Sequence, residues 1–124
     1  MKQLVCMLAM VALCLLTGEG LAADKAAIKK NVDTVVNALN DGTPATSFGA
    51  DAFTPYVFIL EPNGKLIVHP YLMGEYLQDK AAPVYAALMQ ATREGRWVTY
   101  FWKGAEKETY VRRTGSNLVV GSGN

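Results

Sequence analysis

The chain has 124 residues, 51% of them hydrophobic and 19% charged, with a formal net charge of +1 at pH 7. This length indicates a single domain. The near-neutral charge argues against a basic binding face, so we expect neither nucleic acid nor an anionic membrane surface as a partner.

The N-terminus has the pattern of a secretory signal peptide. Lys2 precedes an apolar run, Leu4–Leu16, which is too short to cross a bilayer, and small residues follow at Gly20 and Ala22. We expect cleavage after Ala22, so that residues 1–22 form the signal and residues 23–124 form one domain in a bacterial periplasm.

Both cysteines, Cys6 and Cys14, belong to this signal. The mature chain therefore has no disulfide, thiol nucleophile or cysteine metal site, and we expect no cofactor. It also has no apolar run long enough for membrane insertion.

Residues 24–40 have the periodicity of an amphipathic helix. Asp24 is placed to cap its start, and Gly42 is placed to end it in the left-handed conformation. The apolar residues recur at spacings of three and four and form one stripe: Ile28, Val32, Val35, Val36 and Leu39. Such a stripe needs a cover, and we expect a sheet there.

A hairpin follows the loop formed by residues 41–54. The apolar runs Tyr56–Leu60 and Leu66–His69 flank Asn63-Gly64, a strong signal for a two-residue turn. With Asn63 and Gly64 as the turn, Phe58 lies across from His69.

Residues 70–82 are broken by Pro70 and Gly74 and are expected to be irregular. A second helix is predicted from Pro83 to about Arg93, with Gly95 placed to stop it. Three strands are then predicted at Trp97–Trp102, Thr109–Val111 and Asn117–Val120. The turn between the first two of these strands is predicted at Lys103–Lys107.

This order predicts an α+β domain of PAS-like type. It would have about five antiparallel strands, an N-terminal helix and a second helix between strands.

Five short stretches carry a family resemblance. "YVFILEPNGKLIVHP", "LMGEYLQDK", "GRWVTYFWKG", "KETYVRR" and "LVVGSG" occur in this order and spacing over residues 55–123. Together they resemble the bacterial single Cache domain, an extracytoplasmic relative of PAS domains. The resemblance implies a sensor module for small molecules, often short carboxylates and sometimes amines or amino acids.

In that family the usual setting is the outer part of a chemoreceptor or sensor kinase, with roles in chemotaxis and signal transduction. This chain departs from that setting, because it has a cleavable signal and no second membrane helix or output domain. The departure leaves ligand binding in place as an expectation. Direct transmembrane signalling is put in doubt.

The candidate ligand-binding residues come mainly from the hairpin between Trp97 and Arg113. A five-residue loop would pair Tyr100 with Tyr110 and Trp102 with Glu108. One face would then carry Tyr100, Trp102, Tyr110 and Arg112. Arg112 is suited to grip a carboxylate, the tyrosines to donate hydroxyl hydrogen bonds, and Trp102 to exclude water. A four-residue loop would shift the pairing, so that only one of the two groups of residues that share a face would stay together.

His69 is the only histidine of the chain. Without cysteine or a carboxylate partner it is a poor metal or catalytic candidate, so no metal site is expected. We expect it at the mouth of the ligand site, where its titration would change affinity between pH 5 and 8. The segment Tyr71–Asp79 would close over the ligand as a lid.

Two function classes remain open at this point. The first is a periplasmic binding or sensing module for a short organic acid or amino acid, which presents its bound form to a membrane receptor or kinase. The second is a ligand-free interaction or dimerisation module, in which the sheet or the N-terminal helix forms a homodimer or docks on a receptor. An enzyme is not expected, because no nucleophile motif or acid/base pair is visible.

Overall fold

The computed structural model describes residues 24–123. The predicted signal peptide lies outside these residues. Residues 24–40 are helical, and two short 3-10 turns, η1 (Ala45–Ser47) and η2 (Ala50–Ala52), follow. The remaining elements are β1 (Phe58–Leu60), β2 (Leu66–Val68), α2 (Leu77–Lys80), α3 (Ala82–Leu88), β3 (Arg96–Trp102), β4 (Ala105–Arg113) and β5 (Val119–Gly123).

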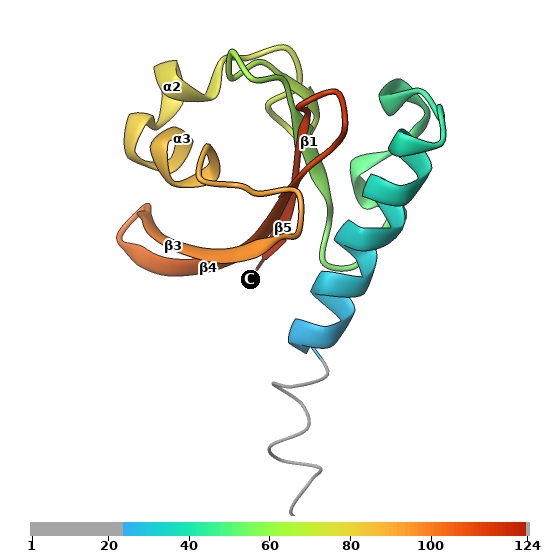
Figure 1. Ribbon diagram of the computed structural model, residues 1–124. Coiled ribbons are helices and arrows are strands. Elements are labelled where there is room, and N and C mark those ends of the chain that lie inside the picture. Colours follow the sequence, from blue (N-terminus) through green and yellow to red (C-terminus); the bar gives the residue numbers. More distant parts are fainter. Residues whose placement is uncertain (1–23, 124) are drawn as a thin grey trace, which may run out of the picture.

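The strands form one antiparallel sheet in the order β2-β1-β5-β4-β3. The N-terminal helix packs on one face of this sheet, and α2 and α3 lie on the other, with the β3–β4 hairpin curling beneath α3 (Figure 1). The prediction of a five-stranded α+β domain of PAS-like type is confirmed.

The N-terminal helix is held by its apolar stripe. Ile28, Val32 and Val35 are fully buried against the outer face of the sheet, beside Val57 and Val120. Burying such a side chain stabilises a fold by roughly 1.5–3 kcal/mol. The helix ends as predicted, because Gly42 takes φ +102° and its N–H bonds the carbonyl of Leu39 at 3.0 Å.

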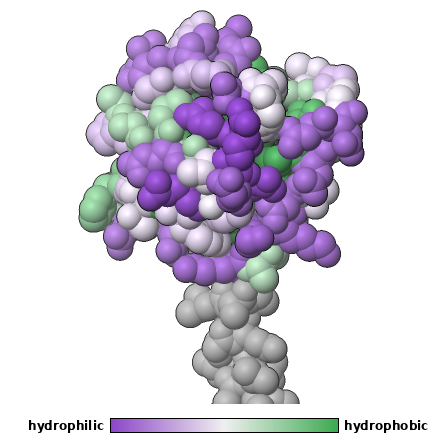
Figure 2. All heavy atoms as spheres, viewed as in Figure 1, coloured by the Kyte–Doolittle hydropathy of each residue, from purple (hydrophilic) through white to green (hydrophobic). Residues whose placement is uncertain are grey.

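The second core lies between the inner face of the sheet and α3. Leu60, Leu66 and Val111 of the sheet meet Val84 and Leu88 of α3. The sheet therefore has two covered faces. Polar residues dominate the view in Figure 2, where the apolar areas are small and separate.

Helix α3 ends at Leu88 rather than at the predicted Arg93. The connection that follows is held by Arg113 of β4, whose side chain donates to the carbonyls of Met89 at 2.8 Å and Ala91 at 3.0 Å. In a longer helix, backbone N–H groups would have bonded to these carbonyls, and the side chain of Arg113 takes their place.

Two further predictions are wrong. The segment 70–82, expected to be irregular, contains the short helix α2. The last strand runs through Gly121 and ends at Gly123, whereas its end was predicted at Val120. Glycine disfavours a strand, but pairing with β1 and β4 continues the strand through Gly121 to Gly123.

Candidate functional site

A cavity of about 260 Å³ lies between the inner face of the sheet and the layer of α2 and α3. This is just below the roughly 300–1,000 Å³ typical of pockets for drug-sized ligands, so it suits a molecule of a few heavy atoms. Its apolar lining is formed by Phe58, Leu66, Leu72, Leu77, Val84, Leu88 and Trp102. Its polar lining is formed by Tyr56, His69, Tyr71, Tyr100, Lys107 and Thr109.

His69 follows β2 and is held in one orientation. Its Nδ1 accepts the backbone N–H groups of Tyr71 at 3.3 Å and Leu72 at 3.2 Å. Because Nδ1 is an acceptor, the proton of the neutral ring is on Nε2, which forms no hydrogen bond with any other described residue. Burial lowers the pKa of His69 to about 4. The ring is therefore a neutral donor at physiological pH, and its titration falls below the range of pH 5 to 8 expected from the sequence.

Three tyrosines line the same cavity. The rings of Tyr56 and Tyr71 stand edge-on to His69, with centroid distances of 5.5 and 4.7 Å. The hydroxyl of Tyr100 lies 2.8 Å from Oγ1 of Thr109. Burial raises the pKa of Tyr100 and raises the pKa of Tyr56 to about 12. These phenols thus stay protonated at neutral pH and are available as hydrogen-bond donors.

Lys107 supplies the positive charge of the site. It lies on β4 directly across from Tyr100 of β3. No acidic side chain is among the described residues that line the cavity. The cavity therefore offers one cation and several neutral donors above an apolar floor.

The register of the β3–β4 hairpin differs from the predicted one. Lys103 and Gly104 form a two-residue turn with positive φ at both positions, 52° and 79°. Tyr100 consequently pairs with Lys107, and Tyr110 pairs with Trp97. The shift from the predicted pairing is three residues, and an odd shift exchanges the faces of one strand relative to the other.

The predicted common face for Tyr100, Trp102, Tyr110 and Arg112 is therefore wrong. Tyr100 and Trp102 line the cavity together with His69. Tyr110 and Arg112 lie on the opposite face of the sheet, beneath the N-terminal helix, and do not line the cavity.

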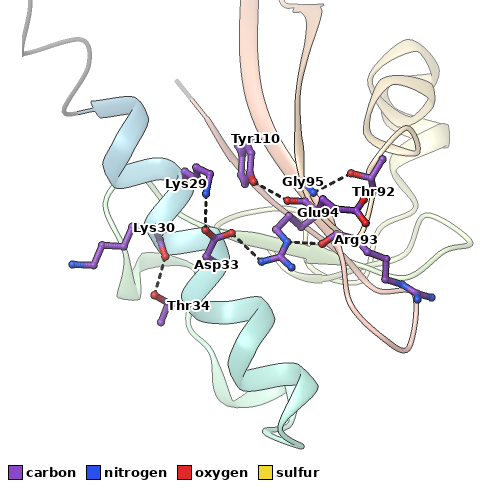
Figure 3. Close-up of polar contacts among 10 residues, drawn as sticks. Lys29, Lys30, Asp33, Thr34, Thr92, Arg93, Glu94, Gly95 and Tyr110 are labelled. Carbon is purple, nitrogen blue, oxygen red and sulfur yellow. Dashed lines mark hydrogen bonds and ion pairs between the residues drawn. The ribbon is translucent and has the colours of Figure 1, made fainter.

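Tyr110 and Arg112 have structural partners there. The hydroxyl of Tyr110 donates to the carbonyl of Glu94 at 3.2 Å, and Nη1 of Arg112 lies 3.0 Å from Oδ1 of Asp33. Lys29 pairs with the other oxygen of Asp33 at 3.0 Å. Figure 3 shows Lys29, Asp33 and Tyr110 between the helix and the connection that leads into β3.

Three polar cavity residues were not predicted from the sequence: Tyr56, Lys107 and Thr109. Tyr71, predicted as the first residue of the lid, is the fourth polar residue of the lining that was not a predicted ligand contact. Lys107 was assigned to a turn, which hid its place on a strand. Recognition of Lys103-Gly104 as a two-residue turn would have put Lys107 and Thr109 on the face of Tyr100.

The segment predicted as a lid touches the cavity only in part. Tyr71, Leu72 and the buried Leu77 line the cavity, whereas Gly74 is tied to β2 through its N–H, 2.7 Å from the carbonyl of Leu66. Tyr71 is 64% exposed. The part of the segment at the mouth is thus the stretch directly after His69.

Within the described residues, no cluster of His, Cys, Asp or Glu is arranged to hold a metal ion. In the same part of the chain, no helix combines the length and the apolar character needed to cross a membrane.

Comparison with known proteins adds one structural relationship. No family profile and no curated protein matches the chain. Among solved structures, the chain is similar to a methyl-accepting chemotaxis protein from Vibrio parahaemolyticus RIMD 2210633, with a TM-score of 0.54 and 20% sequence identity. The alignment covers 86% of this chain and 91% of that chain. At this identity the likeness shows a shared fold.

Proposed function

We propose that this protein is a periplasmic sensing or binding module of single Cache type, whose cavity takes a short organic acid. The observation that carries the proposal is the polar lining: Lys107, His69 and three tyrosines line one cavity, and no acidic side chain is among its described lining residues. The similarity in fold to a chemotaxis protein supports a sensing role.

The charge of the lining favours a carboxylate over an amine. A carboxylate would accept charge-assisted hydrogen bonds from Lys107 and from the neutral donors around it. An ammonium group would enter a site with no counter-ion and would lose its hydration without compensation. We therefore expect simple acids to bind better than amino acids of the same length.

The apolar lining of the cavity is the second contribution to ligand recognition. Leu72, Val84 and Leu88 line the side of the cavity away from the sheet. A short alkyl body would replace water against these side chains. Binding would favour the state in which the stretch after His69 and α3 close on the sheet, and this state would be presented to a membrane receptor or kinase.

The alternative of a ligand-free interaction module finds less support. The apolar stripe of the N-terminal helix is already buried on the sheet of its own chain, with Val32 and Val36 at 0% exposure. This face is therefore not free to form a homodimer. The cavity is also open, whereas a pure interaction module would fill it with side chains.

The test is isothermal titration of the mature protein with propionate and, as matched ligands, alanine and propionamide. We expect binding of propionate only, and a higher melting temperature in its presence. Lys107→Met should weaken propionate binding by about tenfold or more, because a hydrogen bond to a charged group contributes about 1.5–3 kcal/mol.

Lys30→Met is the control, since Lys30 is an exposed lysine of the N-terminal helix, on the other side of the sheet. It should bind propionate as the unchanged protein does. Equal binding of alanine and propionate, or full affinity in Lys107→Met, would contradict the proposed recognition.

A further inference from the structure

The central strand β5 has two glycines on the face that meets the cavity. Gly121 pairs with Phe58 of β1, and Gly123 pairs with Thr109 of β4. Gly121 is buried in the middle of the sheet. A glycine in a strand interior weakens the strand, because it adds chain entropy to the unfolded state and packs no side chain. Gly121 inside the central strand and Gly123 at its end therefore require a reason.

The reason is not backbone conformation. The glycines with positive φ in the described chain are at other positions, such as Gly64 and Gly95. Neither Gly121 nor Gly123 takes a left-handed conformation, so the backbone itself would accept any residue there. What excludes a side chain is space.

At Gly121 the space is taken by an aromatic ring. A Cβ atom at this position would lie 2.5 Å from Cζ, 2.9 Å from Cε1 and 3.1 Å from Cε2 of Phe58. Normal carbon contacts are about 3.5–4.0 Å, so the ring rests directly on the bare backbone of β5. Phe58 is 7% exposed and lines the cavity. The ring thus lies between Gly121 and the cavity space.

Gly123 has a related effect on the polar lining. A Cβ atom there would lie 2.7 Å from Oγ1 of Thr109 and against the carbonyl of Glu108. Oγ1 of Thr109 is the atom that holds the hydroxyl of Tyr100. The missing side chain of Gly123 therefore leaves room for the contact that positions Tyr100.

We propose that Gly121 determines the depth of the cavity, and hence the longest ligand that it accepts, by letting the ring of Phe58 lie flat against β5. The inference rests on the proposed function for its ligand. An alanine at this position moves the ring off the strand, and the space into which it moves is the cavity. Gly121 is a specificity residue that acts through Phe58 and does not itself contact the ligand.

The test compares four proteins: the unchanged chain, Gly121→Ala, Phe58→Leu and the double variant. Each is titrated with straight-chain monocarboxylates from two to six carbons, and the crystal structures of the unchanged chain and of Gly121→Ala are determined. In Gly121→Ala we expect the longest acid that the unchanged chain binds to lose about tenfold or more in affinity, while the shortest changes by less than about threefold. The double variant regains the long acid, because leucine leaves room for the added methyl group.

Val120→Ala is the matched control. Val120 is the neighbour of Gly121 on β5, but it faces the core beneath the N-terminal helix. This change lowers stability without altering the order of affinities along the acid series. A loss of long acids in Val120→Ala as well would show that general loosening is the cause, and would overturn the inference.

The two proposals fail in different ways. If the unchanged chain binds none of the acids, the proposed function is wrong, and the position of the ring in the Gly121→Ala structure still decides the inference. A ring displaced into a smaller cavity supports it. A ring that stays in place, with an unchanged cavity, overturns it whatever the titrations show.

Discussion

Nη1 of Arg112 lies 3.0 Å from Oδ1 of Asp33, although the two residues are 79 positions apart in the chain. Nε of the same guanidinium donates to the carbonyl of Arg93 at 2.8 Å. One side chain of β4 therefore holds both the N-terminal helix and the connection that leads from α3 into β3. A residue that the sequence suggested as the ligand's anion partner is a structural clamp on the other side of the sheet.

Arg112→Met should lower the free energy of unfolding by about 1–2 kcal/mol, because it removes a half-buried ion pair and a hydrogen bond to a carbonyl. Affinity for propionate should not change. Chemical denaturation and titration measure the two quantities, and Arg96→Met is the control because Arg96 is exposed and in no ion pair among the described residues. A loss of affinity without loss of stability would restore Arg112 to the binding site.

Tyr100→Phe and Tyr110→Phe form a matched pair on opposite faces of the sheet. Removing the hydroxyl of Tyr100 should weaken propionate binding by roughly threefold to tenfold, because one donor is lost, and should cost about 1 kcal/mol of stability, because the bond to Thr109 is lost. Removing that of Tyr110 should cost about 1 kcal/mol of stability, because the bond to Glu94 is lost, and should leave affinity unchanged. An equal change in affinity in both variants would mean that the face assignment is wrong.

His69 gives the protein a dependence of stability on pH. Its pKa is about 4 in the folded chain, where burial lowers it, and about 6.5 when unfolded. The unfolded state thus binds a proton that the folded state does not, so this contribution is fully present above pH 6.5 and is lost as the pH falls toward 4. When solvent screening is taken into account, the contribution of His69 to the free energy of unfolding is about 2 kcal/mol.

His69→Asn isolates this contribution, since Asn keeps an acceptor for the backbone N–H groups of Tyr71 and Leu72. Denaturation curves between pH 4 and 8 should fall more steeply on the acid side for the unchanged protein than for the variant. Parallel curves would show that His69 titrates normally in the folded state. Because His69 stays neutral between pH 5.5 and 8, its titration should not change the affinity for propionate in this range.

Gly95→Ala should be among the most damaging single changes. Gly95 takes φ +100°, and an added Cβ would overlap the hydroxyl of Tyr110 and lie 2.8 Å from Cγ of Arg112. We expect a loss of more than about 2 kcal/mol, from backbone strain together with displacement of the clamp. Gly104→Ala has a positive φ but open space around it, so it measures the strain alone, at about 1 kcal/mol. Equal losses in both would remove the steric part of the explanation.

The sequence was sufficient for local features. Periodicity located the N-terminal helix and its buried stripe, Gly42 marked its end, and Asn63-Gly64 predicted the first hairpin. The expected register of that hairpin holds at Ile59 and Val68 and shifts by one residue at the next pair, Leu60 with Leu66. The predicted two-residue turn is wrong, because Glu61 pairs with Lys65 and the loop has three residues, 62–64. These features depend on residues close in the chain, where turn chemistry and side-chain spacing decide.

The site was harder because it depends on the length of one turn. Lys103-Gly104 closes the β3–β4 hairpin with two residues, and the polar stretch Ala105–Lys107 was read as loop although it continues β4. That error placed Tyr110 and Arg112 on the wrong face and left out Lys107. Charged residues on an exposed strand end look like loop residues when the partner strand is not known.

The two-residue turn has an implication for related chains. Strand β4 is fixed by five pairs with β5, whereas β3 is an edge strand held through β4. A single inserted residue at Lys103-Gly104 that moved the pairing by one place would turn Thr99 and Phe101 toward the cavity in place of Tyr100 and Trp102. Homologues that differ only by such an insertion would then bind different molecules, although every residue of the original lining was still present in the alignment.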